Sequence, residues 1–450
     1  MNITYKIYTS LVLMALFIYF YYEILKINMM VFLIFMRGIL SPNKFWWNIS
    51  DIFLNDSSGV EMYRNLKKKT DRKIIPIAFF GHNVNLIVDK DFIKQTLDLS
   101  PSIFGVGELK YDVFKSFMKK NVGVSEGREW FNRRIINEKV LDSQKFHQKY
   151  HEDISNLIKK NPYLKDSNDF TSLGKKIAEK IVFNDESIPD EVFKIFSDAN
   201  SLIVILRGNV DMKHSENMKI YLKYLDEQIK NPKQLSLVHR GIMYENNFDE
   251  ILHQIPHWIF PIVGTVSMSF PRLLLVLNNH PHILSNLIDE LKNSDLNEAS
   301  SIYNLSYLRK CILEMLRLNN PVVTTFRNLL KDYNFTSDET QYKYKKGEQF
   351  LILNNPVLRD EEYFKHPDQY IPERWSSQTE KSYYSIMFNK GPQECPGKEL
   401  SIFIIMSCVV NYFRHTGLLE KNIWKLTEPK INSKKIQQMI NPFSIKFEYI

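Results

Sequence analysis

The chain has 450 residues, of which 44% are hydrophobic and 24% are charged. With 15 glycines and 18 prolines it has the composition of a globular protein with a large core, which excludes the fibrous and intrinsically disordered classes. Basic residues exceed acidic ones by 59 to 51, and because no zinc-type spacing, RNA-binding pattern or glycine-rich phosphate loop accompanies them, we expect no nucleic acid partner.

An apolar segment opens the chain. Residues 10–22 carry no charge, and the run continues past Glu23 to roughly 17 residues, close to the minimum for crossing a bilayer. A cleaved signal peptide is the alternative, but no small-residue cleavage site follows the run. Lys26 and Arg37 follow the run while Lys6 alone precedes it, which favours the cytosolic side for the rest of the chain.

We therefore predict an uncleaved membrane anchor in residues 1–40, with a span at about residues 9–25. A second apolar segment, residues 29–36, either extends the span or lies at the membrane interface. No linker rich in proline, serine or glycine divides the remainder, so residues 41–450 are predicted to form one large domain.

Two strands are predicted early in this domain, at residues 74–80 and 84–88, joined by a turn at Gly81-His82-Asn83. Short strands also come late, at residues 349–353 and 445–450. Between them, apolar residues recur with helical spacing at residues 91–97, 128–142, 147–159, 173–183, 218–230, 281–291 and 307–318. The predicted fold class is mainly α with small β-sheets (α+β), the sheets lying at one side.

The cysteines point to a reducing compartment. Cys311, Cys395 and Cys408 make an odd number with no disulfide-type spacing. Cys311 and Cys408 lie within apolar helical patterns and are expected in the core. Cys395 differs, because it lies in a loop bounded by glycine and proline.

Cys395 precedes an apolar helix predicted at residues 398–414. We expect Pro396 at the first helical position, which makes Cys395 similar to an N-cap residue near the positive end of the helix dipole. That environment favours the thiolate, which is the form that donates electrons to a haem iron. Gly391 and Gly397 are expected to leave room for a flat group close to the backbone.

The spacing Phe388-x-x-Gly391-x-x-x-Cys395-x-Gly397 resembles the haem-binding loop of the cytochrome P-450 family. The resemblance implies the cytochrome P-450 fold, with haem b buried between a long distal helix and this loop. It makes Cys395 the axial ligand of the iron and places Phe388 beside the sulfur. Gln393 departs from the pattern, because the family usually has Arg or His there to contact a haem propionate; Gln393 donates a hydrogen bond without a charge.

A second motif joins two segments. Glu314 and Arg317 share one face of the helix predicted at residues 307–318, and Arg374 follows in Pro372-Glu373-Arg374-Trp375. Taken alone, the helical pair is an ordinary surface ion pair. In the family, the corresponding three residues form a buried network that locks the cysteine loop to the core. The resemblance therefore assigns this network to Glu314, Arg317 and Arg374.

Other matches concern the haem propionates. Arg327 lies after Pro321, in a segment that resembles the stretch from which the family contacts one propionate. Trp130 and Arg134 match the Trp-x-x-x-Arg helix that faces the other propionate. A guanidinium suits both places because it forms bidentate, charge-assisted hydrogen bonds.

The distal helix departs most from the family. Counting back from His280-Pro281, Thr265 falls on the alcohol that commonly organises proton delivery to oxygen, whereas Gly264 replaces the usual acid. Protons would then travel by water, Thr265 or a histidine such as His253 or His257. Pro261 and Pro271 are expected to bend this helix. Residues 258–277 also fit a second membrane span, but we expect a buried core helix.

The resemblance implies a membrane-anchored haem-thiolate monooxygenase with its catalytic domain in the cytosol, as at the endoplasmic reticulum. It would insert one atom of O2 into a lipophilic substrate (a sterol, a fatty acid or similar) with electrons from a diflavin or ferredoxin-type reductase, so that NADPH acts only indirectly. The alternatives are a hydroperoxide isomerase, dehydratase or peroxygenase that needs no reductase, which the loss of the acid at Gly264 favours, and a haem-binding pseudoenzyme of low activity.

Overall fold

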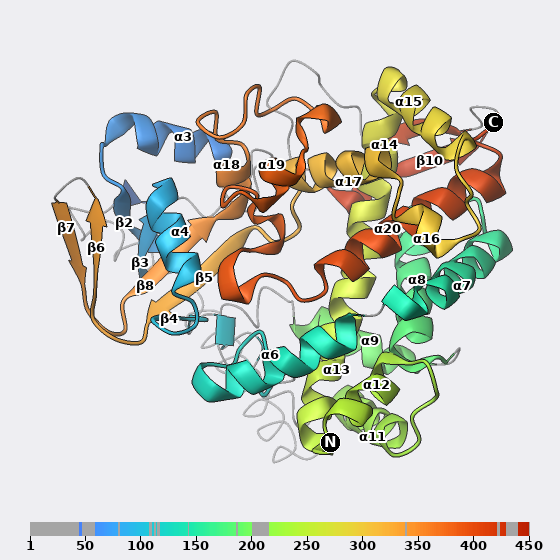
Figure 1. Cartoon of the computed structure of the whole chain (residues 1–450), viewed down its shortest axis with the longest axis horizontal. Coiled ribbons are helices and arrows are strands. Elements are labelled where there is room, and N and C mark those ends of the chain that lie inside the picture. Colours follow the sequence, from blue (N-terminus) through green and yellow to red (C-terminus); the bar gives the residue numbers. More distant parts are fainter. Residues whose placement is uncertain are drawn as a thin grey trace, which may run out of the picture.

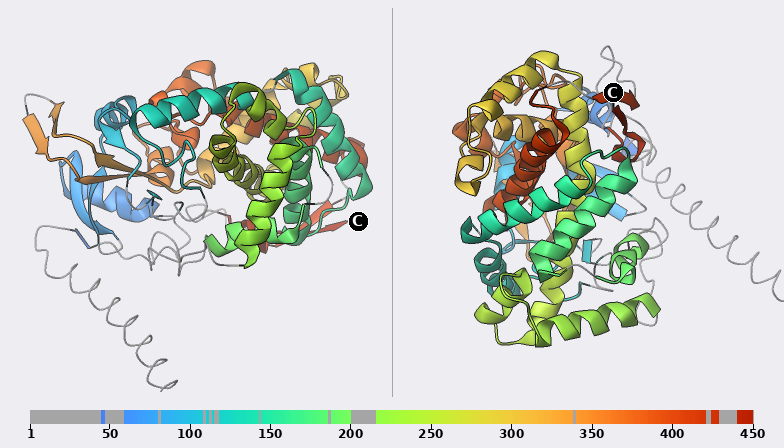
Figure 2. Two further views of the ribbon diagram at one scale, coloured as in Figure 1. Left: turned by 90° about the horizontal axis from the view of Figure 1, so that it is seen from below. Right: turned by 90° about the vertical axis from the view of Figure 1, so that its right-hand side faces the viewer.

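A computed structural model describes most of the domain that follows the predicted anchor. The described residues are 45–46, 59–79, 82–107, 110–111, 114, 118–142, 144–185, 188–199, 216–337, 340–420, 424–428 and 440–449. The predicted anchor, residues 1–40, lies outside them. Helices fill one side of the molecule and the main sheet lies at the other (Figure 1), and the same separation is seen from below (Figure 2). The predicted arrangement of a helical fold with small sheets at one side is confirmed.

The main sheet joins segments that are far apart in the sequence. Its six strands run in the order β1-β2-β3-β8-β5-β4. The predicted early hairpin forms, with β2 antiparallel to β3, while β8 is parallel to β3 and antiparallel to β5. The strands are β1 (Phe45–Trp46), β2 (Ile74–Phe79), β3 (His82–Ile87), β4 (Phe104–Gly105), β5 (Thr324–Leu329) and β8 (Gln349–Leu353).

Two small sheets complete the β structure. The hairpin of β6 (Tyr333–Ser337) and β7 (Thr340–Tyr344) extends from the main sheet, as Figure 1 shows. The other sheet pairs β9 (Trp424–Glu428) with β10 (Lys446–Tyr449) near the C-terminus. The sequence predicted β10 but neither β9 nor the β6–β7 hairpin. In β6 and β7 aromatic residues alternate with polar ones, which is the pattern of a half-buried strand, so the sequence signal for this hairpin is present although the prediction missed it.

Most predicted helices agree with the structure within two residues at each end: α4 (Lys90–Asp98), α6 (Gly127–Leu141), α7 (His147–Lys160), α11 (Glu216–Lys230), α15 (Pro281–Lys292), α17 (Ser306–Leu318) and α20 (Lys398–Thr416). The helix predicted at residues 173–183 begins earlier, as α8 (Ser167–Ala178), and continues as the π-helix η2 (Glu179–Phe183). Six further helices were not predicted: α3 (Val60–Lys69), α9 (Asp190–Ala199), α12 (Leu237–Tyr244), α16 (Ala299–Ile302), α18 (Asn354–Leu358) and α19 (Ser377–Lys381). Several begin at a capping side chain, as where Asp89 accepts hydrogen bonds from Asp91 N and Phe92 N at the start of α4.

The helix expected to cross the distal side is a run of three segments. It consists of α13 (Phe248–Gly264), the π-helix η4 (Thr265–Ser269) and α14 (Phe270–Asn278). Pro256 and Pro261 lie inside α13, and Pro271 lies in the first turn of α14, where a missing N–H costs little. Among the described residues this run alone is long and apolar enough to cross a membrane, yet 67% of its most apolar window is buried within the protein. That burial agrees with a core helix.

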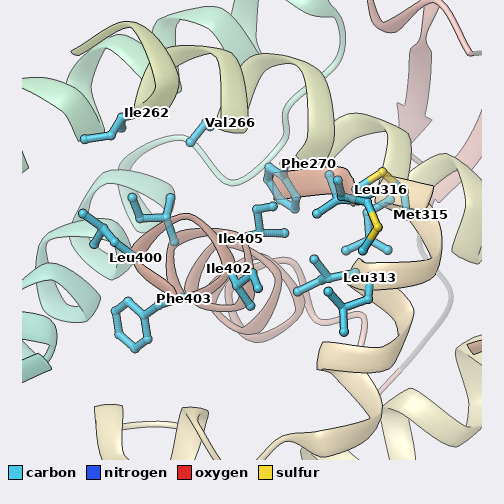
Figure 3. Packing of buried hydrophobic residues seen from close by; sticks show 14 of the residues in the cluster. Ile262, Val266, Phe270, Leu313, Met315, Leu316, Leu400, Ile402, Phe403 and Ile405 are labelled. Carbon is cyan, nitrogen blue, oxygen red and sulfur yellow. The ribbon is translucent and has the colours of Figure 1, made fainter. Parts of the chain in front are cut away.

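The centre of the helical part is α20. It packs against α7, α17, η4 and α14, and Figure 3 shows its side chains between the distal helices and α17. Phe403 and Ile405 of α20, Phe270 of α14 and Leu313 of α17 are each at most 2% exposed. Burying one such side chain stabilises the fold by roughly 1.5–3 kcal/mol. The cysteine loop therefore leads into a helix that is buried along most of its length.

Candidate active site around Cys395

The cysteine loop is wound tightly by its own backbone. Two short 3-10 turns, η6 (Ile386–Phe388) and η7 (Gly391–Gln393), precede the cysteine. Cys395 N donates to Phe388 O over 2.8 Å, and Asn389 Nδ2 donates to Gln393 O over 3.1 Å. The carbonyls of Phe388 and Gln393 therefore fix the turn that presents the sulfur.

The start of α20 differs from the prediction. The N-cap residue is Gly397 and the helix begins at Lys398, so Pro396 lies in the preceding turn and not at the first helical position. Burial raises the pKa of the Cys395 thiol, and this outweighs the lowering by a hydrogen bond from Gly397 N–H and by the charge of Arg134. The prediction that the loop by itself favours the thiolate is therefore wrong in direction, because loss of hydration dominates.

Cys395 nevertheless keeps accessible surface. It is exposed by area, whereas Cys311 and Cys408 are buried. Exposed area beside a thiol whose pKa is raised by burial is what a sulfur lining an interior hollow would show. This is the place that a ligand of a bound metal group requires.

The two glycines of the loop have different roles. Gly391 has a φ of +70°, and a Cβ there would lie 2.5 Å from Leu97 O at the end of α4. The absence of a side chain at Gly391 thus allows the loop to pack closely against the backbone of α4. The expectation that this glycine makes room for a flat group is wrong. At Gly397 the nearest atom to such a Cβ is Leu141 Cδ1 at 3.7 Å, an ordinary contact. The expectation of open space is retained only at Gly397.

Glu314 forms the centre of a buried network. Its Oε1 accepts from Arg317 Nη2 over 2.8 Å and from Arg374 Nε over 2.9 Å, and its Oε2 accepts from Arg317 Nε over 2.9 Å. The side chains of Glu314 and Arg317 are both 0% exposed. The structure thus brings together the three residues that the sequence grouped, and each carboxylate oxygen has more than one donor.

The network reaches further than the motif showed. Glu314 also accepts from Trp375 Nε1 over 2.9 Å and from Ile371 N over 3.0 Å. Arg317 Nη1 donates to Leu358 O over 2.7 Å and to Pro367 O over 2.6 Å. Charged side chains therefore hold the backbone of the segment before the cysteine loop. The sequence offered Trp375 only as a neighbour of Arg374.

Helix α6 contacts the loop directly. Arg134 Nη1 donates to Glu394 O, next to Cys395, and its Nε donates to Glu138 Oε1 over 2.7 Å. Trp130 is buried at 8% exposure on the same helix. The sequence missed the neighbouring Arg133, which forms a bidentate pair with Glu250 at 2.7 and 3.0 Å and so ties α6 to α13.

Arg327 on β5 keeps a hydrogen-bond donor open. Its Nε donates to Ser100 Oγ over 2.8 Å and its Nη1 to Phe326 O over 2.7 Å. Its Nη2 is buried without an acceptor in the described part of the chain. Burial lowers the pKa of this guanidinium to about 10. An unmet buried donor costs about 1–3 kcal/mol, so this position suits an anionic ligand.

One face of the distal run is more open than the others. Pro261, Gly264 and Thr265 keep accessible surface, whereas Ile262 and Val266 are buried. A Cβ at Gly264 would meet only Met268 Cε, at 3.1 Å, among atoms within 4 Å. No aspartate or glutamate occurs between residues 251 and 288. The open face therefore carries the hydroxyl of Thr265 without a neighbouring acid on its own helix.

The two histidines considered for proton delivery lie farther along α13. His257 and His253 precede Thr265 by eight and twelve residues, which corresponds to about 12 and 18 Å along a helix. Burial lowers the pKa of both imidazoles, that of His257 to about 4. Neither reaches Thr265 directly, so a proton path from either one requires water.

Known proteins are similar to this chain both in sequence and in structure. The family model of cytochrome P450 matches residues 194–447, more than half of the chain. The crystal structure of the cytochrome P450DA haem domain is similar with a TM-score of 0.68, covering 88% of this chain and 94% of that one. Its sequence is 14% identical, so this likeness shows the fold alone.

The curated relatives have varied names. The chain is 28% identical over 160 residues to 9-divinyl ether synthase of Capsicum annuum, covering 32% of this chain and 33% of that protein. It is 31% identical over 153 residues to beta-amyrin 11-oxidase of Glycyrrhiza uralensis (32% and 30%), and 26% identical over 248 residues to a divinyl ether synthase of Solanum lycopersicum (53% and 48%). The matches thus span 30% to 48% of the length of these relatives. The chain belongs to the cytochrome P450 family.

Proposed function

We propose that the chain is a haem-thiolate monooxygenase acting on a lipophilic substrate. The observation that carries the proposal is Cys395, an accessible cysteine on a loop that Arg134 contacts and that follows the segment held by the Glu314 network. The cytochrome P450 family implies a haem cofactor and makes the chain an oxidoreductase by class. A monooxygenase within that class is our inference from the site.

The residues present fit haem. The open Nη2 of Arg327 suits one propionate, while Trp130 and Arg134 suit the other. Phe388 and Gln393 would lie beside the group, and Gly397 leaves space next to the sulfur. A ferric iron would supply the positive charge that converts the Cys395 thiol to a thiolate despite its raised pKa. Haem, when bound, supplies the activation of O2 with two electrons from a reductase.

The protein's own contribution differs on the two sides. Glu314, Arg317 and Arg374 hold the backbone of the segment before the cysteine loop, and Arg134 contacts Glu394 O next to the sulfur, which together would limit movement of the loop. On the distal run, Thr265 holds a hydroxyl on the accessible face that can donate or accept a proton. The apolar surroundings favour a lipophilic substrate.

A second candidate function follows from the missing acid. Since residues 251–288 carry no carboxylate, proton delivery to oxygen depends on Thr265 and water. A hydroperoxide isomerase, dehydratase or peroxygenase needs neither that delivery nor a reductase. The likeness to proteins named divinyl ether synthases supports this candidate, and the likeness to beta-amyrin 11-oxidase supports the monooxygenase. A haem-binding pseudoenzyme remains the third candidate.

The cellular setting is also a proposal. The apolar segment of residues 9–25 would anchor the chain in a membrane, with residues 41–450 in the cytosol, as at the endoplasmic reticulum. The electrons would come from NADPH through a diflavin or ferredoxin-type reductase. A lipophilic substrate could then enter from the lipid.

The iron ligand is tested by the change Cys395→Ser. We expect the haem-loaded variant to lose the thiolate-type absorption spectrum of the ferrous carbon monoxide complex, because a serine hydroxyl is a poor ligand for ferrous iron. Cys408→Ala is the matched control, since it removes another thiol of the same segment, within α20, and should leave the spectrum unchanged. Survival of the spectrum in Cys395→Ser would overturn the ligand assignment.

The reaction class is tested with the full chain and a diflavin reductase. Consumption of O2 and NADPH supports the monooxygenase. Rapid decay of an added lipid hydroperoxide without such consumption supports the isomerase or peroxygenase. Inactivity in both assays supports the pseudoenzyme.

A further inference from the structure

A buried ladder of hydrogen bonds joins α6 to α13. Asn137 of α6 donates through Nδ2 to Gln254 Oε1 over 3.0 Å, and its Oδ1 accepts from Trp258 Nε1 over 2.8 Å. One turn earlier on both helices, Arg133 forms its ion pair with Glu250. Because residues four apart lie on the same face of a helix, these contacts fix how α13 is placed along α6.

Gln254 is the central member of this ladder and is 0% exposed. Besides the bond from Asn137, its Oε1 accepts from Val122 N over 3.1 Å. Its Nε2 donates to Lys120 O over 2.8 Å and to Glu250 O over 3.2 Å. A buried amide that is paired in this way favours one arrangement of the segments it joins, because a shift would leave donors or acceptors unmet.

The ladder lies where the backbone of α13 is weakened. Pro256 is inside the helix, between Gln254 and Trp258. Because proline has no N–H, the helical hydrogen bond to Leu252 O is missing, and a helix bends readily at such a point. The indole of Trp258 is also confined from α12, since a Cβ at Gly241 would lie 3.0 Å from its Cη2. The ladder therefore holds α13 on both sides of the proline.

The same turn of α6 contacts the cysteine loop. Arg134, the neighbour of Arg133, donates to Glu394 O. Helix α6 is thus hydrogen-bonded to the loop through one residue and to α13 through the next. Thr265 follows Pro256 by nine residues, so a bend of roughly 20° at the proline would displace Thr265 by roughly 5 Å. The direction of α13 at Pro256 therefore sets the distance between Thr265 and the loop.

We propose that Gln254 is a positioning residue, which fixes the direction of α13 against α6 and thereby the place of Thr265 relative to the cysteine loop. The inference rests on the proposed function, in which the loop and Thr265 act on two sides of the haem. Gln254 touches no reacting group, because its side chain is enclosed by α6, α13 and residues 120–122. The alternative is a purely structural role, in which Gln254 stabilises the fold without affecting the place of Thr265.

The test uses the haem-loaded full chain and two measurements, which are amide hydrogen exchange in residues 255–270 and the infrared stretching band of carbon monoxide on the ferrous iron. Gln254→Met keeps the length of the side chain and removes its hydrogen bonds. We expect exchange in this segment to become roughly tenfold faster or more. The carbon monoxide band should shift or broaden, because Thr265 changes its place. Trp258→Phe removes a single bond of the ladder and should change both measurements in the same direction, but less.

The role of the proline is tested with Pro256→Ala, which can restore the helical hydrogen bond to Leu252 O. We expect Gln254→Met to change both measurements less in this background than in the unchanged protein. Asn411→Ala is the matched control, since it removes another fully buried amide, one that is hydrogen-bonded within α20 and to α7. It should lower the stability of the protein and leave the band unmoved.

Two results would overturn the proposal. An unmoved band in Gln254→Met and Trp258→Phe, whatever their stability, would leave Gln254 with a structural role only. An equal effect of Gln254→Met in both backgrounds would show that the ladder does not serve to hold α13 at Pro256. If Gln254→Met fails to retain haem, Trp258→Phe decides by the same criteria. The visible spectrum of the same complex reports the iron ligand separately, so an unmoved band with an intact spectrum rejects this inference and leaves the haem-thiolate assignment standing.

Discussion

The cysteine loop and the distal face of α13 lie on opposite sides of the site and are built differently. The loop is held by hydrogen bonds within its backbone and by Arg134, and the carboxylate of Glu314 with its several donors holds the segment before the loop. The face of α13 is defined by small or apolar residues and by isolated polar groups such as Thr265. Backbone hydrogen bonds and buried charges tolerate few substitutions, whereas side chains that line a face tolerate many. We therefore expect the motifs of the loop side to identify the family, and the residues of the α13 side to differ with the substrate.

The largest expected effect lies on the loop side. Glu314→Ala removes the acceptor of Arg317 and Arg374, and leaving buried charge unpaired typically costs about 3–5 kcal/mol. We expect the free energy of unfolding to fall by that amount in urea denaturation, and the haem content to fall with it.

Glu250→Ala is the matched change on the distal side. Its partner Arg133 keeps hydrogen bonds to Ser125 Oγ at 2.6 Å and Glu129 Oε2 at 2.9 Å, and the side chain of Glu250 is 23% exposed. The expected loss is about 1 kcal/mol, with normal haem content. Equal losses in the two variants would remove the distinction between the sides.

A glycine on each side gives the second prediction. In Gly391→Ala the new side chain has to adopt a left-handed conformation, which costs roughly 1–2 kcal/mol. Its Cβ would also lie 2.5 Å from Leu97 O, and the backbone shift that relieves this contact costs roughly 1–3 kcal/mol. Gly264→Ala meets only the flexible end of Met268 in a helical conformation, where alanine is favoured by up to about 1 kcal/mol. Thermal and urea unfolding should show a loss for the first change and none for the second.

Gly417→Ala separates the two causes at Gly391. Gly417 has a φ of +78° and nothing within 4 Å of an added Cβ, so only the conformational cost applies. A loss at Gly391 no larger than that at Gly417 would mean that the contact with α4 can relax. The loop side would then be less constrained than we infer.

The smallest effect concerns acid stability. His147 stacks with both Tyr303 and Phe403, which also stack on each other, and burial, followed by the charge of Arg240, lowers its pKa to about 4. Below about pH 6.5 the unfolded chain takes up a proton that the folded chain excludes, so stability falls as the pH drops from about 6.5 to about 4. At pH 5 this amounts to about 1–2 kcal/mol.

His147→Phe keeps the stacking and removes this contribution. The decrease in unfolding free energy between pH 7 and pH 5 should be smaller in the variant. Loss of the hydrogen bond to Tyr303 also lowers the stability of the variant at pH 7, but it does not affect this comparison. His282→Phe, on the exposed face of α15, should leave the decrease unchanged. An unchanged decrease in His147→Phe would show that His147 is protonated in the folded state.

Much of the helical framework followed from periodicity alone. The strand predicted at residues 349–353 is β8, and the helix predicted at residues 307–318 differs from α17 by one residue. The grouping of Glu314, Arg317 and Arg374 came from the resemblance to the family, since the spacing of Glu314 and Arg317 alone is that of an ordinary surface ion pair. Their roles towards haem, like those of Arg327 and Trp130, stay predictions.

What could not be predicted depends on contacts between distant segments. Nothing near Gly391 in the sequence indicates that Leu97 O lies against it, and the pairing of Arg133 with Glu250 joins two helices over 117 residues. Nothing in the sequence indicates that the side chains of Lys110 and His257 both lie near Gly123. The low hydration of Cys395 likewise arises from packing, which is why a local argument gave the wrong direction for its pKa.

The partners of Glu314 also bear on the order of folding. Its hydrogen bonds reach residues 3, 57, 60 and 61 positions away, and Arg134 contacts the cysteine loop across 260 positions. Closing long stretches of chain is slow, so contacts of this range form after local helices. The loop therefore reaches its final geometry late, once α6 and α17 have docked. We therefore expect haem to bind after the chain has folded, and not to start its folding.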